Sequence, residues 1–269
     1  MSVYDLGKRR RRRGGRVRPS PLFLAFVAVA VGGALLAWSQ NGPGSRLGDL
    51  GVFLFVLGGW VVSVCLHEFA HAYAAFRAGD HSVEAAGYLT LNPFKYAHPL
   101  LSIVLPLLFI VQGGIGLPGG AVYLHPQAFR SKRSQSIAAA VGPVTNAVFG
   151  VVLLLLARHH GDLATHPRFW TAVAFLGFLQ LTAAVLNLLP IPGLDGYAII
   201  EPYLDPQTRN TGDKIKPWGM IGVIVLLQFG SLRTAFFDLV NALYRLTGAN
   251  EALWQFGHEF FKFWVKNPF

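Results

Sequence analysis

Two histidines and a glutamate with the potential for metal and acid–base chemistry stand within five consecutive positions. His67, Glu68 and His71 form the pattern His-Glu-x-x-His. On a helix, residues four apart share one face, so both imidazoles can bind a single Zn²⁺. The carboxylate can then act as general base on the water that the metal activates. By composition alone the chance of one such match is roughly 0.5%, so the pattern indicates a catalytic zinc site.

The motif lies in a long apolar segment. Residues 51–66, directly before it, are almost wholly apolar. Ionisable side chains in such surroundings are costly and indicate function by default. The alternative is a pair of hydrogen-bonded interfacial histidines beside a glutamate that reaches water, and the pattern favours zinc over it.

A catalytic zinc needs a third protein ligand and one open position. Acidic residues are scarce, and the best candidate is Asp195, near the end of Asn-Leu-Leu-Pro-Ile-Pro-Gly-Leu-Asp-Gly at 187–196. Pro190 and Pro192 must break the helix that leads there. A broken helix at membrane depth is tolerated where it is buried in protein or lines a wet cavity. The alternative is a helix-ending turn at the interface with a solvated aspartate.

Asn146 is another polar residue in apolar surroundings. It follows Gly142-Pro143, where the proline predicts the first turn of a helix. Its amide needs a partner, which is either a neighbouring helix or the backbone of a substrate. The sequence leaves both alternatives open.

The two motifs, about 130 residues apart, together resemble the site-2 protease family of intramembrane zinc metalloproteases, of the compact type without a PDZ domain. The resemblance covers about residues 58–197, roughly half of the chain. It includes Gly79-Asp80, Leu-Thr-Leu-Asn-Pro at 89–93, and Gly142-Pro143 with Asn146. The chain departs from many compact members at Tyr96, His98 and Tyr197.

The resemblance implies one catalytic zinc ion bound by His67, His71 and Asp195, with Glu68 activating water. It also implies that Asn187 hydrogen-bonds the substrate or the developing oxyanion. The expected enzyme is a zinc-dependent endopeptidase that hydrolyses a peptide bond within or near the transmembrane segment of a membrane-anchored substrate, such as a single-span regulator.

Two other functions are weighed against this one. The first is a catalytically silent or metal-handling membrane protein, either a pseudoprotease or a transporter. Such a protein would keep the metal ligands but would need no general base, so the presence of Glu68 counts against it. The second is a CAAX-type membrane protease, which also uses His-Glu-x-x-His. It would require a downstream glutamate ligand on a helix, whereas this chain has Leu-Asp-Gly.

The composition places these motifs in a membrane protein. Of 269 residues, 53% are hydrophobic and 13% are charged, about half the charged fraction of a soluble domain. The chain is therefore predicted to be an all-α polytopic membrane protein of five to six membrane segments, with β-like loops at 85–92 and 119–126 that could hold an unwound substrate. The apolar segments lie at about 22–38, 51–76, 136–157, 170–189 and 218–232, with 100–117 as an ambiguous sixth.

Positive charge is concentrated at the N-terminus. Most of the net charge of +10 lies in residues 1–20, and such a tail indicates a cytoplasmic N-terminus near anionic lipid rather than a nucleic-acid partner. The first apolar segment lacks a convincing cleavage site and is interpreted as an uncleaved anchor in a prokaryotic plasma membrane. Residues 21–240 are expected to form a single integral-membrane metalloprotease domain, and the aromatic-rich residues 241–269 predict an interfacial helix.

Topology constrains the ambiguous segment. With the N-terminus inside, 51–76 runs inward and places His67 and His71 nearer the cytoplasmic side. If 100–117 also spans, Asp195 emerges on the opposite side, beyond the reach of zinc–ligand bonds of about 2.0–2.2 Å. A re-entrant or peripheral 100–117 brings Asp195 beside the histidines, and the re-entrant arrangement is favoured.

Overall fold

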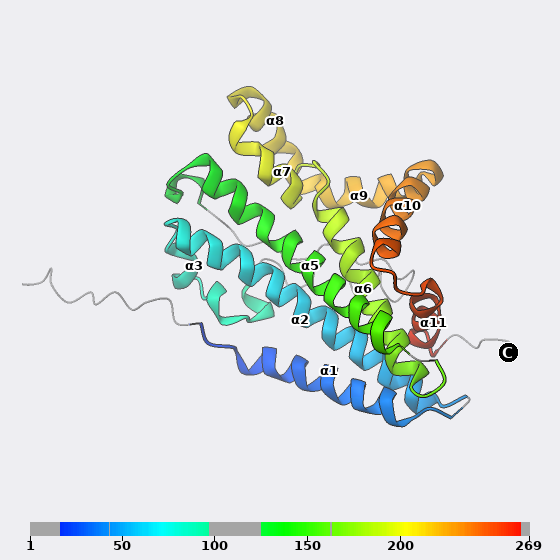
Figure 1. The fold of residues 1–269 in the computed structure, drawn as a ribbon. Coiled ribbons are helices and arrows are strands. Elements are labelled where there is room, and N and C mark those ends of the chain that lie inside the picture. Colours follow the sequence, from blue (N-terminus) through cyan, green and yellow to red (C-terminus); the bar gives the residue numbers. More distant parts are fainter. Residues whose placement is uncertain (1–16, 43, 97–124, 162, 265–269) are drawn as a thin grey trace, which may run out of the picture.

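The computed structural model is a bundle of helices (Figure 1), and it describes residues 17–42, 44–96, 125–161 and 163–264. Among these residues there is no strand, and four helices are long and apolar enough to cross a membrane. They are α1 (Pro21–Ser39), α2 (Arg46–Ala78), α5 (Lys132–His160) and α6 (Pro167–Asn187). The predicted all-α membrane class is confirmed, and four of the predicted apolar segments are these helices.

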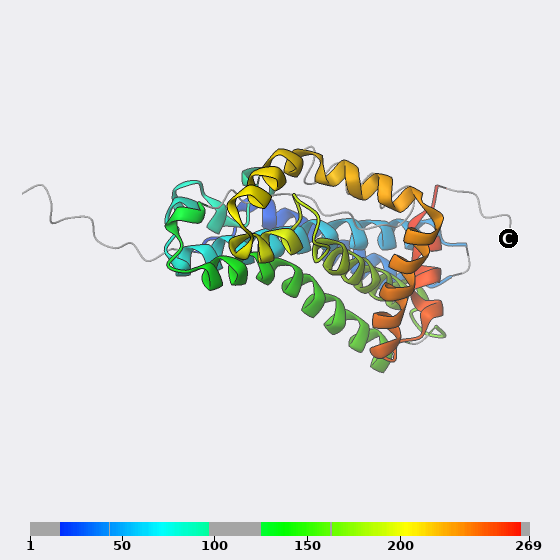
Figure 2. The ribbon, with the colours of Figure 1, turned by 90° about the horizontal axis from the view of Figure 1, so that it is seen from above.

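The four long helices run in alternating directions along the chain. The amide of Ser20, before α1, donates to the carbonyl of Thr90, and that of Arg130, before α5, donates to the carbonyl of Ala78, the last residue of α2. The starts of α1 and α5 therefore lie at the end of the bundle that carries α3 (Ser82–Ala85), which we call the α3 end. The opposite end, which carries α11 (Glu251–Phe261), is the α11 end (Figures 1 and 2).

A buried ion pair closes the α11 end. The Nε atom of Arg168, at the start of α6, lies 2.7 Å from Oδ1 of Asp49 in α2. Its Nη1 donates to the carbonyls of Gln40 and Gly42 at 3.1 and 2.9 Å, and its guanidinium lies over the ring of Phe260. One side chain thus joins the α1–α2 connection, α2, α6 and α11.

The prediction of a β-like loop at 85–92 is wrong. The chain there forms the end of α3 and a 3-10 turn, η2 (Tyr88–Thr90), with left-handed residues at Gly87 and Leu91. The alternating apolar side chains Leu89 and Leu91 are buried in clusters with residues of α2, so packing on a helix produced the pattern that resembled a strand. For the second β-like run, residues 119–124 lie outside the described part, and Pro126 begins a 3-10 turn, η5 (Pro126–Ala128).

The prediction that 218–232 forms one membrane-spanning helix is also wrong. α9 (Gly219–Gln228) has ten residues, about 15 Å of helix, which is half the hydrocarbon thickness. Phe229 is extended and separates α9 from α10 (Gly230–Leu246). The two helices together lead from the α3 end to the α11 end, because Thr247 accepts a hydrogen bond from Arg158 in the last turn of α5.

The predicted C-terminal boundary at residue 241 falls inside α10. The aromatic-rich helix is α11, which packs on α6: the Trp254 ring stacks on Phe178 with centroids 4.1 Å apart, and Phe261 is fully buried.

The ambiguous segment 100–117 lies outside the described residues, as does most of the tail 1–20. The described residues that follow it in sequence lie at the α3 end, where the amide of His125 donates to Oδ2 of Asp80 at 2.9 Å. Because α2 ends and α5 begins there, α6 also finishes toward the α3 end, as the sequence argument for the third ligand requires.

Candidate metal centre

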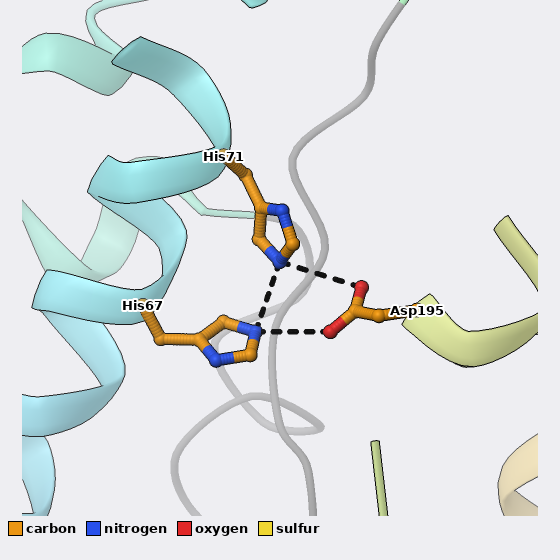
Figure 3. Close-up of side chains that lie close together, drawn as sticks. All are labelled: His67, His71 and Asp195. Carbon is orange, nitrogen blue, oxygen red and sulfur yellow. Dashed lines mark hydrogen bonds and ion pairs between the residues drawn. The ribbon is translucent and has the colours of Figure 1, made fainter. Parts of the chain in front are cut away.

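The three predicted zinc ligands meet in the structure (Figure 3). His67 and His71 project from one face of α2, and Asp195 is the first residue of α7 (Asp195–Ile200). The two Nε2 atoms are 3.0 Å apart. Oδ2 of Asp195 lies 3.2 Å from Nε2 of His67, and Oδ1 lies 3.3 Å from Nε2 of His71. Both histidines are buried, so the cluster is shielded from solvent on the α2 side.

These distances fit a zinc ion. Four ligands at about 2.0–2.2 Å in a tetrahedron are separated by about 3.3–3.6 Å, close to the three observed distances. Two imidazoles and one carboxylate are also a donor set that catalytic zinc uses, with the fourth position left for water or substrate. Among the described residues the third member is an aspartate and no glutamate joins the group, which disfavours the CAAX-type alternative.

The protonation of His71 suits a metal ligand. Its Nδ1 lies 2.6 Å from the carbonyl oxygen of Ala138 in α5. A carbonyl can only accept, so Nδ1 donates its proton there and the lone pair of Nε2 faces the cluster.

Asp195 reaches the cluster because the chain turns sharply after α6. That helix ends at Asn187, as predicted from Pro190 and Pro192. Gly193 has φ of 100°, which favours glycine, and a Cβ on Gly196 would lie 2.2 Å from the carbonyl oxygen of Leu188. The two glycines allow the turn to fold back against the end of α6.

Helix α5 forms a wall of the site. A Cβ on Gly142 would lie 2.1 Å from Nε2 of His71 and 2.7 Å from Nε2 of His67, so only glycine fits. Ala138 and Gly142 are four residues apart and share one face of α5. Sequence reasoning included Gly142 in the resemblance but missed this contact, and a backbone carbonyl such as that of Ala138 has no side-chain signal.

Pro143 lies inside α5, so the prediction that it starts a helix is wrong. The helix begins eleven residues earlier along the chain, at Lys132, where Ser131 and Ser134 form a capping box. Pro143 has no amide hydrogen for the carbonyl of Ala139, which opens the hydrogen-bond ladder next to Ala138.

The remaining predicted site residues are buried. Glu68 follows His67 on α2 and is 2% exposed. Asn146 lies one turn beyond Gly142 on the same face of α5, and its Oδ1 has no hydrogen-bond partner among the described residues. Asn187 is the last residue of α6 and is 5% exposed. Their roles as base and substrate ligands stay predictions.

The chain is similar to proteins from three bacteria. A protein of Mycolicibacterium smegmatis named "Putative zinc metalloprotease Rip2" is 50% identical over 248 residues, which are 92% of this chain and 95% of that protein. A protein of the same name from Mycobacterium tuberculosis is 46% identical over the same shares. "Putative zinc metalloprotease YwhC" of Bacillus subtilis is 32% identical over 189 residues, 68% of this chain and 84% of that protein.

No protein-family model and no solved structure matches the chain. The names of the relatives agree with the zinc-binding donor set, and they favour hydrolysis over metal transport.

Proposed function

The chain belongs to the site-2 protease family of intramembrane zinc metalloproteases, and we propose that it cleaves single-span, membrane-anchored regulators near the cytoplasmic end of their membrane helix. It is an integral membrane protein and a zinc-dependent endopeptidase that hydrolyses a peptide bond within or near a transmembrane segment. The observation that carries this function is the meeting of His67, His71 and Asp195 within a bundle of apolar helices.

Each residue of the site has a separate role in the proposed hydrolysis. A zinc ion bound by the cluster would polarise the scissile carbonyl and acidify a water molecule. Glu68 takes the proton of the attacking water and passes it to the leaving amine. A helical substrate hides its carbonyls in hydrogen bonds and must unwind before attack, and the amides of Asn146 and Asn187 then bind its freed backbone groups.

We further propose that the α3 end faces the cytoplasm. Lys and Arg side chains are more numerous there than at the α11 end, and positive charge favours the cytoplasmic side. The basic tail, which in sequence precedes α1, would then contact anionic lipid. Basic residues in the described part of the α3 end are Arg18, Arg77, Lys95, Arg130, Lys132, Arg133, Arg209, Lys214 and Lys216. Those at the α11 end are Arg46, Arg158, Arg168, Arg245 and Lys262.

Cleavage of a defined substrate tests the activity. The purified protein in proteoliposomes, loaded with zinc, is expected to cut a single-span peptide in the cytoplasmic half of its helix, with the cut site located by mass spectrometry. A chelator should stop the reaction and added zinc should restore it. Stoichiometric zinc without any cleavage would instead favour the catalytically silent or metal-handling alternative.

Cysteine labelling tests the orientation. The single native cysteine, Cys65, is buried, so it gives little background with a membrane-impermeant maleimide. Gln255→Cys, exposed on α11, is expected to react in intact cells. Asn210→Cys, exposed on α8 (Pro206–Ile215) at the α3 end, should react only after lysis. The reverse pattern would contradict the proposed orientation.

A further inference from the structure

A pocket of about 500 Å³ lies between α7 and α8 at the α3 end. Its polar lining is Tyr197, Asp205, Gln207, Thr208 and Thr211, and apolar lining comes from Pro192 and Ile215. Helix α7 separates it from the zinc cluster, because Asp195 and Tyr197 are two residues apart on that helix and face different sides. The polar, exposed sequence of α8 places the pocket in water rather than in lipid.

Tyr197 brings an unused donor to this pocket. The residue is 5% exposed, and its hydroxyl has no hydrogen-bond partner among the described residues. A Cβ on Gly212 would lie 1.9 Å from that hydroxyl, so the phenol is packed directly on the backbone of α8. A buried donor without an acceptor is costly, and a carbonyl group entering the pocket would supply the acceptor.

Asp205 brings an unneutralised negative charge. The other two acidic side chains of this region, Glu201 and Asp213, are paired with Lys216 at 2.6 and 2.8 Å. Asp205 has no ion pair in the part of the chain that the structure describes, and it accepts hydrogen bonds from the hydroxyl and amide of Thr208. These bonds hold the pKa of Asp205 below its ordinary value, so the carboxylate stays charged at neutral pH.

We propose that this pocket binds the basic segment that follows the membrane helix of the substrate on the cytoplasmic side. The inference rests on the proposed function and names a second contact surface for the same substrate. Single-span proteins carry Lys and Arg at that position. Much of the α3 end would repel such a segment because it is itself basic, whereas Asp205 attracts it.

The chemistry of the pocket matches an extended basic peptide. A Lys or Arg of the substrate pairs with Asp205, and its aliphatic stem lies on Pro192 and Ile215. A backbone carbonyl accepts from the hydroxyl of Tyr197. Since Tyr197 and the zinc ligand Asp195 belong to one short helix, a few extended residues at about 3.3 Å each connect the scissile bond to the pocket.

Two mild substitutions test the site. Asp205→Asn removes the charge but keeps an N-cap for α8, because asparagine caps as well as aspartate. Tyr197→Phe removes only a hydroxyl that has no described partner. Glu84→Gln, in α3 at the same end of the bundle but outside the pocket, is the matched control.

Each variant is assayed on two single-span substrates that differ only in Lys or Gln residues after the helix. Asp205→Asn is expected to raise KM for the Lys substrate about threefold to tenfold, with kcat unchanged and no effect on the Gln substrate. Tyr197→Phe should raise KM for both substrates, because it acts on the backbone. If KM for both substrates is unchanged in both variants, the proposed substrate contact at the pocket is wrong. Cleavage by the unaltered protein would still support the proposed protease activity.

If neither substrate is cleaved, a binding measurement still tests whether the pocket binds the basic segment. The fluorescent Lys-containing flank peptide alone is titrated onto the full-length protein and onto Asp205→Asn. Weaker binding to the variant supports the pocket independently of catalysis. Equal binding to both proteins, or displacement of the peptide by free lysine at the same concentration as by unlabelled peptide, would overturn it.

Discussion

Glu68→Gln is expected to abolish peptide hydrolysis and leave zinc bound. Glutamine has nearly the same shape as glutamate but cannot take a proton from water, and general-base catalysis contributes about 10²–10⁴-fold to rates. The ligands His67, His71 and Asp195 are untouched, so the metal content should stay near one ion per chain. Cleavage of a single-span peptide in proteoliposomes, together with metal analysis of the same preparation, measures both results.

The matched control is Glu259→Gln, an exposed glutamate on α11 at the opposite end of the bundle. It makes the same chemical change and should leave cleavage and zinc content unaltered. Turnover by Glu68→Gln at the rate of the unaltered protein would remove Glu68 from the mechanism. Loss of zinc in that variant would instead show that Glu68 supports the ligands.

Gly142→Ala is expected to weaken zinc binding strongly. The added methyl group would lie 2.1 Å from Nε2 of His71, which is the ligand atom itself. Either His71 rotates away or α5 moves back, and the second movement pulls the carbonyl of Ala138 from Nδ1 of His71. Zinc affinity should fall by at least the 10–100-fold that loss of a supporting hydrogen bond costs, and cleavage should fall with it. Zinc competition against a chromogenic chelator measures the affinity.

Gly32→Ala in α1 is the control for this change, because a Cβ there meets nothing within 4 Å. It should retain zinc and activity and gain slightly in helix stability. Normal zinc affinity in Gly142→Ala would mean that α5 does not approach the histidines as closely as described.

Much of the metal centre could be predicted because its signals are local. His67 and His71 are four apart on a helix, and Pro190 and Pro192 mark the break that releases Asp195 from α6. The four long spans were also visible as apolar runs. These features depend on side-chain type and spacing along a short stretch of chain, which a sequence records directly.

The errors come from tertiary packing. Leu89 and Leu91 alternate with polar residues because they pack on α2, and not because they belong to a sheet. The apolar run at 218–232 contains a helix break at Phe229 that hydropathy does not register. Pro143 lies in the interior of α5 because the capping box of Ser131 and Ser134 starts that helix much earlier in the chain.

The bonds of Arg168 determine how the bundle can open. Separating α6 from α2 at the α11 end would strip a buried guanidinium of Asp49 and of two carbonyls, so that end acts as a pivot. Asp49 and His67 are separated by eighteen residues of α2, about 27 Å. A rotation of about 10° around the pivot would move His67 by about 5 Å relative to Asp195, more than zinc–ligand bonds of about 2.0–2.2 Å can span. A zinc ion held by both helices would therefore lock the α3 end of α2 to the end of α6, as Arg168 locks the other end.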